Sequence, residues 1–256
     1  MKKLVIANWK TNPKTAREAV LLAHAVEKSV RHVSRKVEVV LAPPFPFLSL
    51  ITYHSSLKLG AQDVFWERGG AYTGEVSASQ LKSLGVSYVI VGHSERRSPL
   101  TGGGETSEMV RKKMTAVLKT GMRAVLCVGE EERKKETAFP PLVREELHEG
   151  LRGVNKSLLR NLIVVYEPPW AISSHKHAKP DTAQNVFEMS ILIRRELVHL
   201  IGKKRAMRTP ILYGGSVDEK NAVLFVREGR VDGLLVGGAS LHPKNFIGIV
   251  RSIAEI

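Results

Sequence analysis

An apolar run followed by a helix-forming stretch recurs eight times along this chain of 256 residues, with no linker-like segment between the repeats. Alternating strands and helices indicate a parallel sheet. Eight such units in a chain of this length favour closure into a (β/α)8 barrel, with residues 1–256 as a single barrel domain. An open, doubly wound sheet is the alternative, but no G-x-G-x-x-G follows the first apolar run, which weighs against a dinucleotide-binding fold.

The apolar runs give the predicted strands Lys3–Ala7, Val37–Ala42, Leu57–Ala61, Tyr88–Val91, Ala124–Val128, Leu162–Tyr166, Ile211–Tyr213 and Gly233–Val236. The predicted helices are Pro13–Val30, Phe45–His54, one from about Ser77, Glu105–Thr120, Thr137–Arg152, Thr182–Leu200, Glu219–Glu228 and Pro243–Ile256. Asn12 is the expected N-cap of the first helix, with Pro13 at its first position. A Ser-x-x-Gln pattern at Ser77 resembles a capping box.

A carboxylate stands at the end of one buried strand. The β-branched run Leu162–Tyr166 is followed at once by Glu167, Pro168 and Pro169. The two prolines fix φ and hold Glu167 in an extended conformation. After them the chain is apolar and then polar as far as Ala178, which predicts a mobile flap hinged beside an acid.

In a parallel barrel, the carboxyl ends of all strands meet at one face, so residues just past the apolar runs become neighbours. Asn8 and Lys10 follow the first run, His93 the fourth and Glu167 the sixth. A base, a hydrogen-bond donor and a cation around one opening suit proton abstraction next to a carbonyl group.

Glycine-rich turns with small hydroxyls follow the last two strands, at Gly214–Ser216 and at Gly237–Ser240. Backbone N–H groups at such turns and at helix N-termini bind phosphate, and barrels commonly place phosphate there. The sequence therefore predicts a phosphate site opposite the acid.

The formal net charge of +14 favours anionic partners, such as a small phosphorylated substrate. No nucleic-acid-binding motif accompanies it. Cys127 is the one cysteine, lies in an apolar run and is expected in the core; its isolation suits a cytoplasmic protein. No apolar run is long enough to span a membrane. Histidines and carboxylates do not occur at metal-ligand spacing, so we expect a reaction without metal.

Eight stretches resemble one family, triosephosphate isomerase, and they cover the chain from end to end in the family's order. They are A-N-W-K (Ala7–Lys10), G-A-Q-D (Gly60–Asp63), A-Y-T-G-E (Ala71–Glu75), V-G-H-S-E-R-R (Val91–Arg97), C-V-G-E (Cys127–Glu130), Y-E-P-P-W-A-I (Tyr166–Ile172), Y-G-G-S-V (Tyr213–Val217) and G-L-L-V-G-G-A-S-L (Gly233–Leu241).

The resemblance implies a TIM-barrel isomerase of glycolysis and gluconeogenesis that interconverts dihydroxyacetone phosphate and D-glyceraldehyde 3-phosphate through an enediolate, without a cofactor. Glu167 would move the proton, neutral His93 would polarise the carbonyl, and Lys10 would stabilise the enediolate. The implied substrate-binding residues are Asn8, Lys10, Ser173, Ser216, Gly237 and Gly238. Glu95 would support Lys10, and Glu130 with Tyr166 would be alternative anchors for Trp170. Thr73 resembles a residue that reaches into a partner subunit, which implies a homodimer.

The chain departs from the family pattern mainly on the flap, where Ser173-Ser174-His175-Lys176-His177 replaces the usual G-T-G-K-T. His175 stands where the family has a glycine, and histidine adopts positive φ less easily than glycine does. We hypothesise that catalysis is retained but flap closure is altered, with some pH sensitivity from His175 and His177. Returning Ser173 and His175 to glycine should then change turnover or its pH profile. Asp63 also replaces the usual asparagine.

Two further functions fit parts of the sequence. Another phosphosugar barrel would share the phosphate site but not the base, and the E-P-P-W-A-I stretch argues against it. A barrel that binds nucleic acid or other anions, with degraded activity, would explain the net charge and the unusual flap. It predicts binding that weakens steeply with salt.

Overall fold

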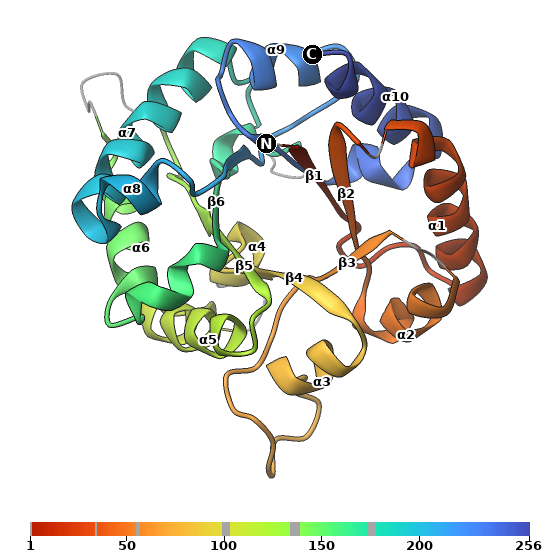
Figure 1. Cartoon of the computed structure of the whole chain (residues 1–256), viewed down its shortest axis with the longest axis horizontal. Helices are drawn as coiled ribbons and strands as arrows, with labels where there is room; N and C mark the ends of the chain where they lie inside the picture. Colours follow the sequence, from red (N-terminus) through yellow and green to blue (C-terminus); the bar gives the residue numbers. More distant parts are fainter. Residues whose placement is uncertain (1, 34, 55–56, 99–102, 134–138, 174–177) are drawn as a thin grey trace.

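The computed structural model describes residues 2–33, 35–54, 57–98, 103–133, 139–173 and 178–256. Eight parallel strands close into a barrel in chain order, and the last strand pairs with the first. The helices form a ring around the strands (Figure 1). The expected (β/α)8 architecture is confirmed. The doubly wound alternative is wrong, since an open sheet would leave its edge strands unpaired.

The strands are β1 (Lys3–Asn8), β2 (Val37–Ala42), β3 (Lys58–Ala61), β4 (Val86–Val91), β5 (Arg123–Val128), β6 (Leu162–Tyr166), β7 (Ile211–Tyr213) and β8 (Gly233–Val236). The α-helices are α1 (Ala16–Val30), α2 (Phe45–His54), α3 (Ala78–Ser83), α4 (Ser94–Arg97), α5 (Ser107–Lys119), α6 (Pro141–Leu151), α7 (Ala183–Ile201), α8 (Lys203–Ala206), α9 (Ala222–Arg227) and α10 (Pro243–Ala254).

The strands are buried on both faces, which explains why their sequences are apolar without interruption. Along β1, Leu4 and Ile6 belong to a cluster inside the barrel, while Val5 and Ala7 belong to the cluster between the barrel and the helices. Cys127 lies in the inner cluster, 1% exposed, so its predicted place in the core is confirmed.

The predicted start of the first helix is wrong. The helix begins at Ala16, and its N-cap is Thr15, not Asn12. The Thr15 hydroxyl accepts from the Glu18 N–H at 3.2 Å, and the Glu18 carboxylate accepts from the Thr15 N–H at 3.3 Å. This reciprocal pair satisfies two N-terminal donors at once, so it outcompetes a cap three residues earlier. The capping box predicted at Ser77 is confirmed, because Gln80 completes it.

Several other helices are also shorter than predicted, including α5, α6, α9 and α10. The helix expected at Glu219–Glu228 is α9, which begins only at Ala222, because the Asp218 carboxylate accepts from the N–H groups of Lys220 and Asn221 in a preceding turn. The helix expected at Thr137–Arg152 is α6, and the first residues of the predicted range lie outside the described residues.

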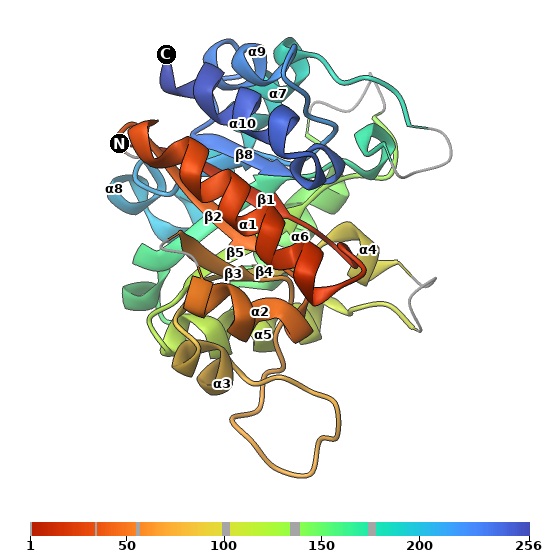
Figure 2. The same cartoon turned by 90° about the vertical axis from the view of Figure 1, so that its right-hand side faces the viewer.

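The segment between β3 and α3 extends away from the barrel as a long arm (Figure 2). Thr73 lies on this arm and is exposed, and Tyr72 beside it is 47% exposed. The Tyr72 ring packs against Phe65 at the base of the arm, with 4.7 Å between ring centroids. Among the described residues, none of the helices has the length and apolar character needed to cross a bilayer.

Candidate active site

A cavity of about 260 Å³ opens where the strands end. Its lining includes every residue that the sequence singled out for catalysis or substrate binding: Asn8, Lys10, His93, Glu167, Ser173, Ser216, Gly237 and Gly238. These residues come from the ends of strands β1, β4, β6, β7 and β8. Closure of the barrel therefore brings together groups that are far apart in the sequence.

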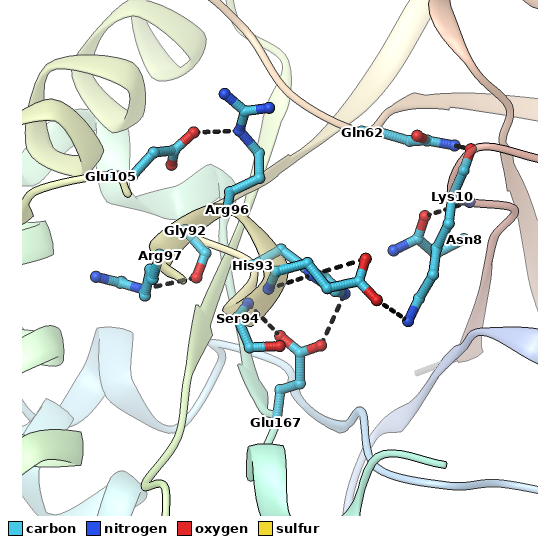
Figure 3. Close-up of polar contacts among 11 residues, drawn as sticks. Asn8, Lys10, Gln62, Gly92, His93, Ser94, Arg96, Arg97, Glu105 and Glu167 are labelled. Atoms are coloured by element: carbon cyan, nitrogen blue, oxygen red, sulfur yellow. Dashed lines mark hydrogen bonds and ion pairs between the residues drawn. The ribbon is translucent and has the colours of Figure 1, made fainter. Parts of the chain in front are cut away.

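His93 lies directly against Glu167. Its Nε2 is 2.7 Å from Oε1 of Glu167 (Figure 3). Its Nδ1 accepts a hydrogen bond from the backbone N–H of Glu95, at 3.2 Å, because His93 is the N-cap of α4. A nitrogen that accepts carries no proton, so the ring proton of a neutral imidazole is on Nε2 and is donated to Glu167. The geometry therefore fits a neutral His93.

Glu167 is 2% exposed but is surrounded by donors. Burial raises the pKa of its carboxyl, but His93, the Ser94 N–H and the charge of Lys10 outweigh burial, so the pKa lies below the ordinary value. The Ser94 N–H donates to Oε2 at 3.2 Å. A carboxylate that is ionised in a dry pocket can act as a general base.

Lys10 adopts a left-handed backbone conformation, with φ of 53°. Its N–H donates to the Asn8 side chain at 3.1 Å, and its carbonyl accepts from the Gln62 amide at 2.8 Å. These two bonds hold a conformation that side-chain-bearing residues seldom adopt. The ammonium group bonds Glu95 Oε1 at 2.5 Å, as the predicted support of Lys10 by Glu95 requires.

Both glycine-rich turns line the cavity, and the turn at Gly237 lies beside the ammonium group. A Cβ atom added to Gly237 would lie 3.5 Å from Cε and 3.9 Å from Nζ of Lys10. Gly237 also accepts from both the N–H and the hydroxyl of Ser240, at 2.8 and 2.6 Å, which fixes the turn. An anion bound over Gly237 and Gly238 would therefore lie beside a positive charge.

The flap begins immediately after Glu167. Both the N–H and the hydroxyl of Ser216 donate to the Ala171 carbonyl, at 2.9 and 2.7 Å, so this flap arrangement occupies Ser216. Ser173 lines the cavity at the flap's first polar position. His175 and His177 lie outside the described residues, so the hypothesis about their effect on closure stays a prediction.

Glu130 holds the aromatic residues on either side of the flap's hinge. Its Oε1 accepts from the Tyr166 hydroxyl at 2.7 Å and from the Trp170 indole N–H at 3.3 Å. The structure thus contains a Trp170–Glu130 bond, one of the two anchors expected for Trp170.

Asp63, where the family pattern has asparagine, is part of a buried ionic network. Its carboxylate bonds Lys113 Nζ at 2.6 Å and Arg96 at 2.9 Å. Glu105 bonds the same two cations. The replacement of asparagine by Asp63 therefore adds a carboxylate that is paired with two cations.

A second carboxylate behind Glu167 could not be predicted from the sequence. Glu146 on α6 is buried and bonds Arg97 and the backbone of Gly129. Arg97 ends the V-G-H-S-E-R-R stretch, but the sequence predicts no function for its side chain. Glu146 sits in the charged stretch R-E-E-L-H-E, in which nothing distinguishes a buried glutamate from an exposed one.

An acid, an imidazole and an ammonium group gathered at the strand ends of a closed barrel place the chain in the class of (β/α)8-barrel enzymes. In the part of the chain that the structure describes, no three His, Cys, Asp or Glu side chains are arranged to hold a metal ion.

A model of the family described as triosephosphate isomerase matches residues 3–253. Proteins named triosephosphate isomerase are similar along the whole chain. The one from Dictyoglomus thermophilum is 37% identical over 98% of this chain and 99% of its own length. Those from Thermoanaerobacter pseudethanolicus and Dehalococcoides mccartyi CBDB1 are both 41% identical, over 97% and 100% of this chain and 98% of each relative. The chain belongs to the triosephosphate isomerase family and is an isomerase.

Proposed function

We propose that this enzyme interconverts dihydroxyacetone phosphate and D-glyceraldehyde 3-phosphate, in glycolysis and gluconeogenesis. The observation that carries the proposal is the shared cavity, which is lined by Glu167, His93 and Lys10 together with the turns at Gly237 and Gly238. Its groups match a substrate that has one acidic C–H bond beside a carbonyl and one phosphate.

Glu167 is the proposed base, which removes a proton from one carbon of the substrate and returns it to the neighbouring carbon. His93 donates its Nε2–H to the substrate carbonyl oxygen and takes up in return the proton of the neighbouring hydroxyl group, so that it ends the reaction as neutral imidazole. Lys10 stabilises the negative charge that develops on the enediolate oxygen. In the structure, Glu167 accepts the His93 proton itself. A substrate carbonyl would take over that bond and leave the carboxylate free to attack the C–H bond.

Phosphate recognition is assigned to the backbone N–H groups of Ser173, Ser216, Gly237 and Gly238. The bonds from Ser216 to Ala171 tie one of these positions to the flap. Binding of phosphate at Ser216 would break those bonds, which would couple occupancy of the anion site to flap movement. Asn8 lines the same cavity and is the proposed neutral substrate contact.

The reaction moves hydrogen between two carbons of one molecule, so it has no net oxidant or reductant. We therefore propose that it needs no redox cofactor, and that His93 and Lys10 polarise the carbonyl group in place of a metal ion.

The exposed arm that carries Thr73 and Tyr72 supports a homodimer in which the arm contacts a second copy. Sedimentation of the protein should then give a species of twice the chain mass, and a purely monomeric active enzyme would contradict this part. A cytoplasmic location stays a prediction, and so does the single-domain organisation of residues 1–256.

A coupled assay on D-glyceraldehyde 3-phosphate tests the proposal. Glu167→Gln removes the base without changing its size, so we expect kcat to fall at least about 10³-fold with KM near the parent value. Glu167→Asp retracts the carboxylate by one methylene and should lose roughly 10²-fold. The control is Glu228→Gln, an exposed residue after α9. A parent without activity, or a Glu167→Gln variant as fast as the parent, would refute the assignment.

A further inference from the structure

Glu146 is a buried carboxylate that links a helix of the outer ring to two loops of the active face. It lies on α6 and is 7% exposed. Its Oε2 accepts a hydrogen bond from the Gly129 N–H at 2.9 Å, and its Oε1 is 3.3 Å from Nε of Arg97. Gly129 follows β5, and Arg97 ends the short helix α4 that follows β4.

Arg97 connects Glu146 to the backbone that carries His93. Its Nε donates to the Gly92 carbonyl at 2.7 Å (Figure 3), and its Nη2 donates to the Cys127 carbonyl at 3.3 Å. A Cβ atom on Gly92 would lie 2.6 Å from Nη2 of Arg97. The guanidinium group therefore packs directly against the residue that precedes His93, and its position depends on the carboxylate behind it.

Gly129 connects Glu146 to the backbone of Glu167. A Cβ atom on Gly129 would lie 2.1 Å from the Glu167 carbonyl oxygen, so the two backbones are in contact. The Glu167 N–H also donates to the Val128 carbonyl, next to Gly129, at 2.8 Å. A shift of Gly129 would therefore move the residue that bears the proposed base.

We propose that Glu146 is a positioning residue for the isomerase reaction: through Gly129 and Arg97, it fixes the backbones from which Glu167 and His93 reach the substrate. This inference rests on the proposed function. Glu146 does not line the substrate cavity. It lines, with Arg97, Gly129 and Glu167, a second cavity on the other side of Glu167. Its effect on the reaction is therefore indirect.

The ionisation of Glu146 adds a measurable signature. Burial, and then the charges of Glu167 and Glu131, raise its pKa to about 7, while Arg97 and the Gly129 N–H act in the opposite direction. The titratable or charged groups that face it from other elements are Arg97 on α4, Cys127 on β5, Glu131 after β5 and Glu167 after β6. An ionised carboxylate accepts from the Gly129 N–H and forms an ion pair with the Arg97 guanidinium, whereas a protonated carboxyl has no charge with which to hold Arg97.

The test compares Glu146→Gln with Glu145→Gln. Glutamine has a single side-chain acceptor and cannot ionise, so it imitates the protonated form. We expect the parent kcat to rise as the pH increases through about 7. In Glu146→Gln, kcat should stay at the low-pH value, roughly tenfold below the parent at alkaline pH, with KM within about twofold. Glu145 is exposed, on the same helix and beside the same cavity, so Glu145→Gln should behave as the parent.

A Glu146→Gln variant with the kcat of the parent across the pH range would overturn the proposal. If its Tm were lowered while kcat stayed at the parent value, Glu146 would have a structural role only, and the proposal would also be wrong. Arg97→Lys is the second variant. It keeps the charge but loses the planar donor pair, so it should lose kcat with KM nearly unchanged, and parent kcat there would also refute the proposal. A parent enzyme that lacks isomerase activity would instead refute the proposed function, so the two failures are distinguishable.

Discussion

Glu167 is a buried base whose charge depends on its donors. Burial favours the neutral acid, and His93, Ser94 and Lys10 reverse that preference, which holds the pKa below the ordinary value. When the His93 Nε2–H donates to a substrate carbonyl, Glu167 loses one hydrogen-bond donor but stays buried. We therefore expect Glu167 to become more basic in the complex than in the free enzyme, at the moment when it must remove a proton from carbon.

At Glu146 the effect of burial outweighs that of the donors, so its pKa is raised. Ionisation of Glu146 therefore destabilises the folded chain. Its pKa is raised from 4.5 to about 7, so between these pH values the folded chain binds more protons at this side chain than the unfolded chain does. The contribution of Glu146 to stability is therefore fully present below the lower value and is lost as the pH rises through the upper one.

Glu146→Gln removes this ionisation, so its stability relative to the parent should improve as the pH rises from about 5 to about 8. Urea unfolding at both pH values measures the difference, with Glu145→Gln as the control of equal charge change. An unchanged difference between Glu146→Gln and the parent at the two pH values would contradict the raised pKa.

At the scale of elements, the strands were predictable because each is buried on both faces. Leu162–Tyr166 and Ile211–Tyr213 were predicted with the bounds that the structure has. Helix ends were less predictable, because competing polar side chains decide them locally. Threonine and asparagine are both common N-cap residues, so residue type alone does not decide between Asn12 and Thr15. The reciprocal bonds with Glu18 place the cap at Thr15.

Replacement of the true cap should therefore destabilise the protein. Thr15→Ala removes the acceptor of the Glu18 N–H and should cost about 1 kcal/mol of unfolding free energy. Asn12→Ala leaves that bond intact and should cost less. Thermal or urea unfolding of the two variants gives the comparison, and a larger loss in Asn12→Ala would restore the cap first predicted from the sequence.

The convergence of the site was predictable from the sequence for a related reason. Once the alternation indicated a parallel barrel, residues after successive strands had to meet at one face, and the cavity lined by Asn8, His93, Glu167 and Gly237 follows from that topology. The link from Glu146 to Gly129 and Arg97 was not predictable, because it depends on how α6 packs against the strand ends.

The whole molecule carries a formal net charge of +14, and its substrate, under the proposed function, is a dianion. Long-range attraction should raise the rate of encounter, and salt screens it over distances of about 10 Å at 0.1 M ionic strength. We expect kcat/KM to fall several-fold between about 0.01 and 0.15 M ionic strength, while kcat changes little. Steady-state kinetics at constant pH measure both, and an invariant kcat/KM would show that encounter does not depend on the net charge.

The central claim is that Glu167 carries a proton between two carbons of a bound triose phosphate. Isomerisation in D₂O, followed by NMR of the product, tests it directly, because a proton held on a carboxylate can exchange with solvent before it returns to carbon. We predict deuterium on the product carbon beside the carbonyl group, formed at the rate of turnover by the parent and lost with turnover in Glu167→Gln. Full conversion by the parent without any solvent deuterium in the product, or undiminished incorporation by Glu167→Gln, would contradict the claim.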